Sequence, residues 1–185
     1  MPQKIYIDAG HNPQNPNAGA EGNGLREQDI TYRVALLLST ILRSDGFETR
    51  LSRPSDTTQL GTSNASSLAA RVNDANSWGA DYFISIHTNA SSSASAAGSE
   101  AYVFRRNSAA DELALDILSG LESFTDIPTR GVFPRPSLYV LKKTRMPSVL
   151  TEIGFITNPA EARLMDSSPN LFAEGIASGI VRFLS

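Results

Sequence analysis

The chain has 185 residues, which is the length of one globular domain. Hydrophobic residues make up 41 % of it and charged residues 19 %, a balance that excludes a disordered chain, and no apolar run approaches the ~20 residues of a membrane span. The net charge of −3 argues against a nucleic-acid partner. The chain has no cysteine, which excludes thiolate chemistry and cysteine-bound metals. It has only two histidines, so any transition-metal site must use both or depend on carboxylates.

Residues 1–4 run directly into a strand-like segment at residues 5–7, without the basic and apolar regions of a signal peptide. We therefore expect no signal peptide in this chain, which fits a trimmed domain or a protein released by another route. No repeat or linker divides the sequence, so residues 1–185 are expected to form a single domain.

Strand-like and helix-like segments alternate along the chain. Strands are expected at Lys4–Asp8, Phe47–Ser52, Asp81–His87, Ser99–Phe104, Tyr139–Leu141 and Ser148–Ile153. Helices are expected at Glu27–Asp45, Ser63–Trp78, Ala109–Phe124, from Pro159 onward and from Pro169 to about Phe183. The first helix is the clearest, because Ile30, Val34 and Leu38 recur at helical spacing. Asn158 and Ser168 each precede a proline, the signal that starts the last two helices.

This alternation predicts an α/β fold, with a mostly parallel twisted sheet of about six strands and helices on both faces. The apolar segments Tyr82–Ile86 and Val149–Leu150 are typical of buried parallel strands. Loops rich in small and polar residues are expected at Asn12–Gly24 and Ala90–Gly98. In open α/β sheets, functional sites form outside the carboxyl ends of the strands.

Both histidines lie at such strand ends. His11 follows the first strand and His87 ends the third, and each precedes a flexible small-residue loop. If the two strands are parallel, the imidazoles reach the same edge of the sheet. A structural, hydrogen-bonded histidine is the alternative interpretation for each. The paired placement favours a shared metal site.

Glu27 supports the metal hypothesis. It precedes Ile30 by three residues and Val34 by seven, so it shares the buried face of the first helix. A carboxylate on that face is costly unless it is paired or bound to a cation. The alternative is an acid that stabilises the helix N-terminus. This explains why Glu27 lies in the first turn of the helix but not why it lies on the buried face. Two histidines and a glutamate suit a zinc site with an open fourth position.

Glu152 follows the apolar segment Val149–Leu150, and a buried glutamate either finds a partner or has a raised pKa. Such a group suits a general base that later donates its proton. A salt bridge with Arg53 or Arg71 is the alternative.

Taken together, these segments resemble the amidase-3 family of zinc-dependent N-acetylmuramoyl-L-alanine amidases, found in bacterial cell-wall hydrolases and phage endolysins. The resemblance extends from Ile5 to about Phe183. Its motifs are IDAGH at 7–11, GLRE at 24–27, LAAR at 68–71 with AN at 75–76, SIHTNA at 85–90, GSEAYVF at 98–104 and LTEIGFITN at 150–158.

The resemblance implies that His11, Glu27 and His87 hold Zn²⁺ and that Glu152 is the catalytic carboxylate. The implied substrate is peptidoglycan, cut at the amide between N-acetylmuramic acid and L-alanine of the stem peptide. Arg71 and Asn76 are expected to be structural ties, as is Arg53. Asp8 is expected either to orient a ligand or to cap backbone groups.

Some family members carry a helix that plugs the site. The stretch 104–139 has one ordinary helix, so we expect an open cleft, with 130–137 as a candidate contact for the stem peptide. We expect a monomer at the cell wall or outside the cell, with no nucleic-acid or membrane partner. Two alternatives are another zinc peptidase or deacetylase and a non-catalytic peptidoglycan-binding module.

Overall fold

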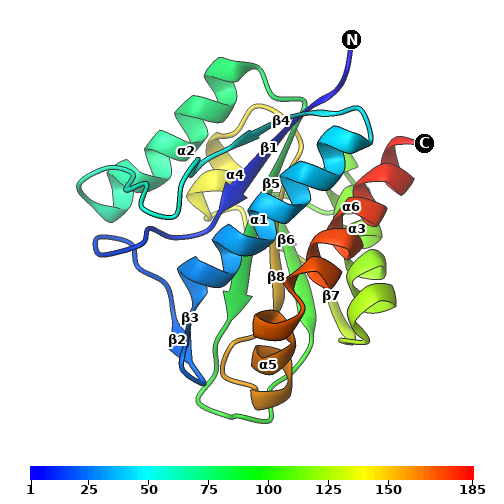
Figure 1. The fold of residues 1–185 in the computed structure, drawn as a ribbon. Coiled ribbons are helices and arrows are strands. Elements are labelled where there is room, and N and C mark those ends of the chain that lie inside the picture. Colours follow the sequence, from blue (N-terminus) through cyan, green and yellow to red (C-terminus); the bar gives the residue numbers. More distant parts are fainter.

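A computed structural model describes residues 1–185. One six-stranded sheet runs through the molecule in the order β4-β1-β5-β8-β6-β7 (Figure 1). Its strands are β1 (Lys4–Ala9), β4 (Glu48–Leu51), β5 (Tyr82–Asn89), β6 (Ser99–Val103), β7 (Thr129–Pro134) and β8 (Ser148–Phe155). All neighbours are parallel except β6 and β8, which are antiparallel. A small hairpin of β2 (Glu21–Gly22) and β3 (Leu25–Arg26) stands apart from the sheet.

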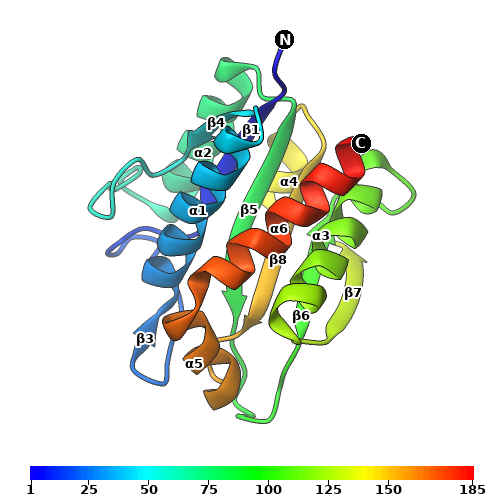
Figure 2. The same ribbon diagram turned by 45° about the vertical axis from the view of Figure 1, so that its right-hand side comes forward.

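Helices cover both faces of this sheet, as the sequence predicts. They are α1 (Glu27–Ser44), α2 (Asn64–Trp78), α3 (Ala109–Thr125), α4 (Tyr139–Lys143), α5 (Pro159–Ser167) and α6 (Pro169–Leu184). Helices α1, α6 and α3 lie side by side across one face, seen from the front in Figure 2. Helices α2 and α4 contact each other on the other face. None of the helices has the length and apolar character that a membrane span requires.

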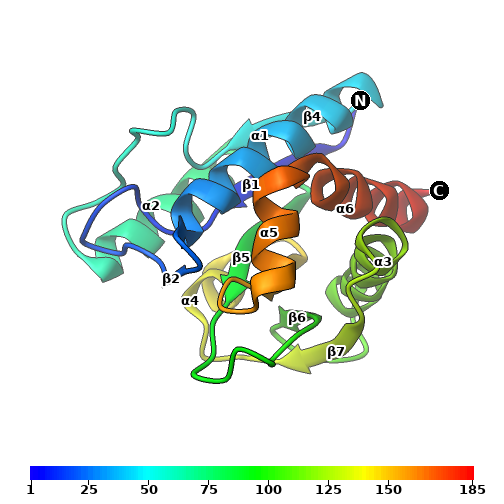
Figure 3. The same ribbon diagram turned by 60° about the horizontal axis from the view of Figure 1, so that its bottom comes forward.

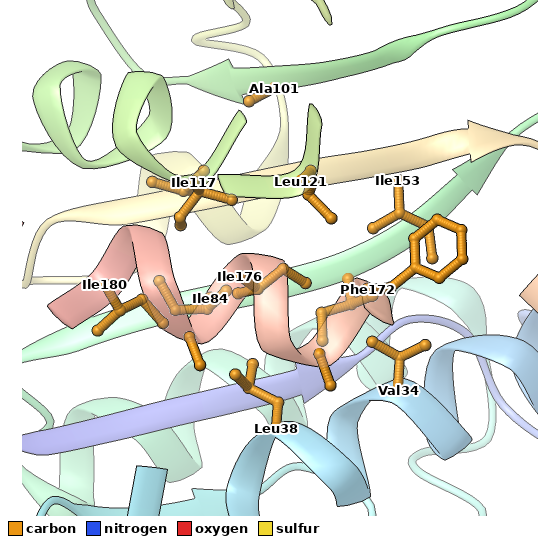
Figure 4. Packing of buried hydrophobic residues seen from close by; sticks show 14 of the residues in the cluster. Val34, Leu38, Ile84, Ala101, Ile117, Leu121, Ile153, Phe172, Ile176 and Ile180 are labelled. Atoms are coloured by element: carbon orange, nitrogen blue, oxygen red, sulfur yellow. The ribbon is translucent and has the colours of Figure 1, made fainter. Parts of the chain in front are cut away.

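The larger core lies under α1, α6 and α3. It is one cluster of 27 buried residues, in which Ile84 and Ile153 of the sheet meet Val34 of α1 and Phe172 of α6 (Figure 4). Helices α3 and α6 pack closely because both have glycine at the crossing: a Cβ on Gly120 would lie 2.1 Å from the carbonyl oxygen of Gly175. A second cluster of eight buried residues fills the space under α2 and α4.

Helices α5 and α6 begin at Pro159 and Pro169 as expected, although the Ser168 side chain makes no capping hydrogen bond. The Ser63 side chain accepts a hydrogen bond from the Ser66 backbone N–H and starts α2, which Gly79 ends with a left-handed φ of 69°. Asn158 accepts from the backbone N–H groups of Ala160 and Glu161 and starts α5.

Two predictions between α3 and β8 are wrong. Tyr139–Leu141, expected as a strand, is the first part of helix α4, whose Val140 and Leu141 are buried against α2 and the sheet. The sixth strand is instead Thr129–Pro134, expected as a connection. This edge strand buries only Val132 fully, and it contains glycine and proline, so it lacks the alternation that identifies a half-buried strand.

Candidate metal centre

Three side chains from distant parts of the chain converge at the carboxyl ends of β1 and β5. Nε2 of His11 lies 3.1 Å from Oε1 of Glu27, and Nδ1 of His87 lies 3.1 Å from the same oxygen. The two ring nitrogens are 3.2 Å apart. The sequence predicts this meeting, because β1 and β5 are parallel neighbours and Glu27 opens the helix that begins beside them.

The triangle fits a tetrahedral zinc ion. Zinc binds imidazole nitrogen and carboxylate oxygen at about 2.0–2.2 Å, so tetrahedral angles place two ligand atoms ~3.3 Å apart. The three observed edges lie close to that length. The side chains of His11 and His87 are 22 % and 18 % exposed, whereas that of Glu27 is 5 % exposed. The site is therefore reached from the side of the imidazoles.

Glu27 is fixed by further hydrogen bonds. Its Oε1 accepts the backbone N–H of Thr88 at 3.0 Å, and its Oε2 accepts that of Ala20 at 2.9 Å. Burial raises the pKa of Glu27, but the hydrogen bonds and charges of His11 and His87 outweigh it and hold the pKa well below its usual range. Glu27 is therefore ionised at neutral pH, which is the state in which a carboxylate can bind a metal ion.

The backbone of His11 is in the left-handed region, with φ at 65°. Two buried arginines hold it there: Nη2 of Arg71 donates to the His11 carbonyl oxygen at 2.6 Å, and Nη1 of Arg53 donates to it at 3.3 Å. Asp8 does not bond to the His11 ring; it accepts hydrogen bonds from Arg71 and from the Ser85 hydroxyl. It thus acts on His11 through Arg71.

Asn76 is a structural tie. Its amide bridges the carbonyl oxygen of Lys143 and the backbone N–H of Arg145, and so joins α2 to the end of α4.

Glu152 lies beside this triangle, on the next strand. It is the register partner of His87 in the parallel pair of β5 and β8. Burial raises the pKa of Glu152 to about 8, with added repulsion from Glu27 and Glu100. Its Oε2 is buried and has no hydrogen-bond partner. The alternative of a salt bridge with Arg53 or Arg71 is not formed, because Arg71 pairs with Asp8 and Arg53 donates to the backbone carbonyl oxygens of His11, Gln28 and Asp56.

Glu100 received no role in the sequence analysis, yet it lies directly opposite Glu152 in the antiparallel pair of β6 and β8. Its carboxylate is compensated by three donors: Asn89 Nδ2 at 2.9 Å, Arg130 Nε at 2.9 Å and the Tyr102 hydroxyl. The only sequence signal for Glu100 is its place in the segment 98–104. Its position opposite Glu152 could not be predicted, because no local pattern shows which strand pairs with β8.

The two small-residue loops have different neighbours. Gly19 of the first loop lies so close that a Cβ there would meet Oε2 of Glu27 at 2.8 Å and the His11 ring at 2.9 Å. The second loop is tied to the chain after β8, since Ser91 N–H bonds to the Thr157 hydroxyl and Asn158 Nδ2 bonds to the Ala96 carbonyl oxygen. Helix α3, between residues 104 and 139, packs against α6 on the face opposite Glu152.

Comparisons with known proteins agree with this geometry. The chain is 38 % identical over 184 residues to CwlM, an N-acetylmuramoyl-L-alanine amidase of Bacillus licheniformis, with 97 % of this chain and 68 % of that protein covered. It is 33 % identical over 195 residues to the endolysin of Bacillus phage SPP1, with 100 % of this chain and 67 % of that protein covered. The chain spans only 35 % of LytC of Bacillus subtilis, to which it is 38 % identical.

Among solved structures, the catalytic domain of CwlV from Bacillus (Paenibacillus) polymyxa superposes with a TM-score of 0.85 at 32 % identity, covering 98 % of both chains. An amidase from Clostridium difficile 630 superposes with a TM-score of 0.88 at 28 % identity, covering 99 % of this chain and 97 % of the other. Residues 5–182 match the Amidase_3 family, described as N-acetylmuramoyl-L-alanine amidase. The chain therefore belongs to the Amidase_3 family of N-acetylmuramoyl-L-alanine amidases.

Proposed function

We propose that His11, Glu27 and His87 hold a zinc ion and that residues 1–185 form the catalytic domain of a peptidoglycan amidase. The bond cut is the amide between the lactyl group of N-acetylmuramic acid and L-alanine of the stem peptide. The observation that carries this proposal is the triangle of two imidazole nitrogens and one carboxylate oxygen with 3.1–3.2 Å edges, next to Glu152, whose Oε2 is buried and has no hydrogen-bond partner.

A zinc ion bound there supplies Lewis-acid chemistry, which polarises an amide carbonyl and lowers the pKa of water. The chain itself supplies the proton transfers. With a pKa of about 8, the Glu152 carboxyl group exchanges a proton near neutral pH, so it is suited to accept one from the attacking water and deliver it to the leaving nitrogen of L-alanine. Its unpartnered Oε2 leaves an oxygen available for this role.

The remaining residues keep the ligands in place. Thr88 and Ala20 fix both oxygens of Glu27 through backbone N–H groups. Arg71 and Arg53 fix the carbonyl oxygen of His11. These contacts orient the metal ligands before substrate arrives, which is what a catalytic site of this kind requires.

The relatives of this chain support action on the cell wall. The named relatives include cell-wall amidases and an endolysin, so we propose that this chain works as a monomer at the wall, outside the cell. The partial exposure of both imidazoles supports an open cleft, since a polymeric substrate must reach the metal from one side.

The test is product analysis on purified peptidoglycan. We expect released stem peptides with a free L-alanine amino group, together with glycan strands that keep their lactyl groups. A chelator should abolish release and added Zn²⁺ should restore it. Cleavage within the peptide would identify a peptidase, and loss of acetyl groups a deacetylase. Binding of the wall without any product, at full zinc content, would identify a binding module.

A further inference from the structure

Aromatic side chains line one part of the sheet face that carries Glu152, at the margin of the cluster under α2 and α4. The cluster under α2 and α4 takes Tyr6, Phe83 and Leu150 from β1, β5 and β8. Strand β7 is at the edge of the sheet, away from α2 in Figure 3. On β6, the alternate residues Glu100 and Tyr102 point to this face, Phe104 directly follows the strand, and Phe133 of β7 is the register partner of Tyr102. Phe104 is 43 % exposed and Phe133 is 37 % exposed. The face beside Glu152 thus carries one half-buried and two exposed aromatic side chains.

Arg135 lies on this surface. Its guanidinium carbon is 4.9 Å from the centre of the Tyr102 ring, and its backbone N–H donates to the Val103 carbonyl oxygen at 2.8 Å. The side chain makes one hydrogen bond, from Nη1 to the Pro134 carbonyl oxygen at 3.1 Å. Stacking on the ring restricts the guanidinium while most of its N–H groups stay free.

The charge of Arg135 is not neutralised by any carboxylate. The neighbouring Arg130 differs, because its Nε lies 2.9 Å from Oε2 of the buried Glu100. No acidic group lies within ion-pair distance of Arg135, although nine such pairs occur in the molecule. A guanidinium that stacks on a ring and has no carboxylate partner is suited to bind an anion, and its planar N–H groups match the two oxygens of a carboxylate.

The strand register shows how far the Arg135 guanidinium lies from Glu152. Glu100 lies opposite Glu152, and Tyr102 lies opposite Leu150. Tyr102 is therefore a diagonal neighbour of Glu152, about 7–8 Å away along the sheet. An extended peptide advances ~3.3–3.6 Å per residue. A peptide whose first amide lies at Glu152 reaches Arg135 within its next two or three residues.

We propose that Arg135, held on Tyr102, binds a carboxylate of the stem peptide beyond L-alanine and makes the enzyme prefer substrates in which that carboxylate is free. This inference rests on the proposed function. The peptide is the occupant that the charge favours, because in the uncleaved substrate the lactyl carboxyl of N-acetylmuramic acid is bound in the amide and the glycan part offers no free carboxylate. Phe133 and the Tyr102 ring give the same peptide an apolar floor.

The experiment uses the zinc-loaded protein and two soluble muramoyl peptides that differ only in one group, a free carboxylate or a carboxamide on the residues after L-alanine. We expect Arg135→Gln to raise KM for the carboxylate substrate roughly tenfold or more with little change in kcat. KM for the carboxamide substrate should stay the same. Arg135→Lys should lose part of the effect, since it keeps the charge without the fork. Arg105→Gln is the matched control, because Arg105 is an exposed arginine beyond the far end of β6.

A second readout does not depend on turnover. The released carboxylate peptide is titrated calorimetrically into the Glu152→Gln protein with and without Arg135→Gln, and we expect roughly tenfold weaker binding in the double variant. Equal KM effects on both substrates, or equal calorimetric affinities, would overturn the inference while cleavage of the muramoyl amide continues. Failure to cleave either substrate would instead refute the proposed function, and the calorimetric comparison would still decide the role of Arg135.

Discussion

Arg71 and Asp8 form an ion pair that solvent does not reach: Nη1 of the arginine lies 2.5 Å from Oδ1 of the aspartate, with side chains 1 % and 2 % exposed. The same guanidinium donates to the carbonyl oxygen of His11. Burial raises the pKa of Asp8, but the Arg71 charge and the Ser85 hydrogen bond outweigh it and hold that pKa below its usual range. One arginine thus connects a buried strand of the core to a proposed metal ligand.

Replacing Arg71 should therefore damage both stability and metal binding. In Arg71→Met, the Asp8 carboxylate stays buried without its partner, which should cost about 3–5 kcal/mol of unfolding free energy. The His11 carbonyl loses a donor, so zinc should bind more weakly as well. Denaturant titration and zinc titration measure the two effects. The control is Arg50→Met, because Arg50 pairs with Asp74 at the surface. This variant should lose at most about 1 kcal/mol of unfolding free energy. Equal losses in the two variants would contradict the role of the buried pair.

Asp8 also predicts how stability responds to acid. Its pKa is lower in the folded state than in the unfolded state, so the unfolded chain takes up the proton first as the pH falls. The stabilisation is present above the unfolded value of about 3.9 and is lost as the pH falls through the folded pKa. Asp8→Asn should flatten the decline of unfolding free energy below about pH 4 in metal-free protein. An unchanged slope would show that Asp8 titrates alike in both states.

The candidate site could be predicted from the sequence because each of its residues carries a local signal. Two histidines end strands, Glu27 lies on the apolar side of a helical pattern, and Glu152 follows an apolar run. The strand Thr129–Pro134 could not be predicted, because an edge strand with one fully buried residue has no periodicity. The partners of Arg71 could not either, since Asp8 is 63 residues away and only the folded sheet brings them together.

Removing a metal ligand should lower the zinc content directly. His11→Ala and His87→Ala each leave two of the three converging atoms, so zinc affinity should fall by more than the ~10–100-fold typical of losing a group that only supports a ligand. Metal analysis after dialysis against a weak chelator measures this. Asp166→Ala, at an exposed acid paired with Arg33, is the control and should keep its zinc. Full occupancy in either histidine variant would contradict the ligand set.

Metal binding should also be lost without touching any ligand. A Cβ on Gly10 would lie 2.6 Å from Cε1 of His87 and 2.6 Å from the Ile86 carbonyl oxygen. Gly10→Ala therefore pushes the His87 ring and the β5 backbone away from residue 10. Zinc affinity should fall although all three ligands remain. Gly46→Ala is the control: Gly46 has a φ of 91° and open space around it, so the variant loses stability by backbone strain alone. Unaltered zinc affinity in Gly10→Ala would show that the His87 ring position does not matter.

Glu152→Gln should separate metal binding from chemistry. The amide has nearly the same shape but cannot accept the proton, so hydrolysis should fall by about 10²–10⁴-fold while zinc content stays full. In metal-free protein the wild type should lose unfolding free energy as the pH rises from about 4.5, where the unfolded Glu152 ionises, to about 8, where the folded one does, and Glu152→Gln should lack this loss. The reason is that the buried Glu152 carboxyl, with a pKa of about 8, must ionise in the folded state at high pH at a cost that the neutral amide does not have. Glu174→Gln on α6 is the matched control for both measurements. Retained hydrolysis in Glu152→Gln would remove Glu152 from the mechanism.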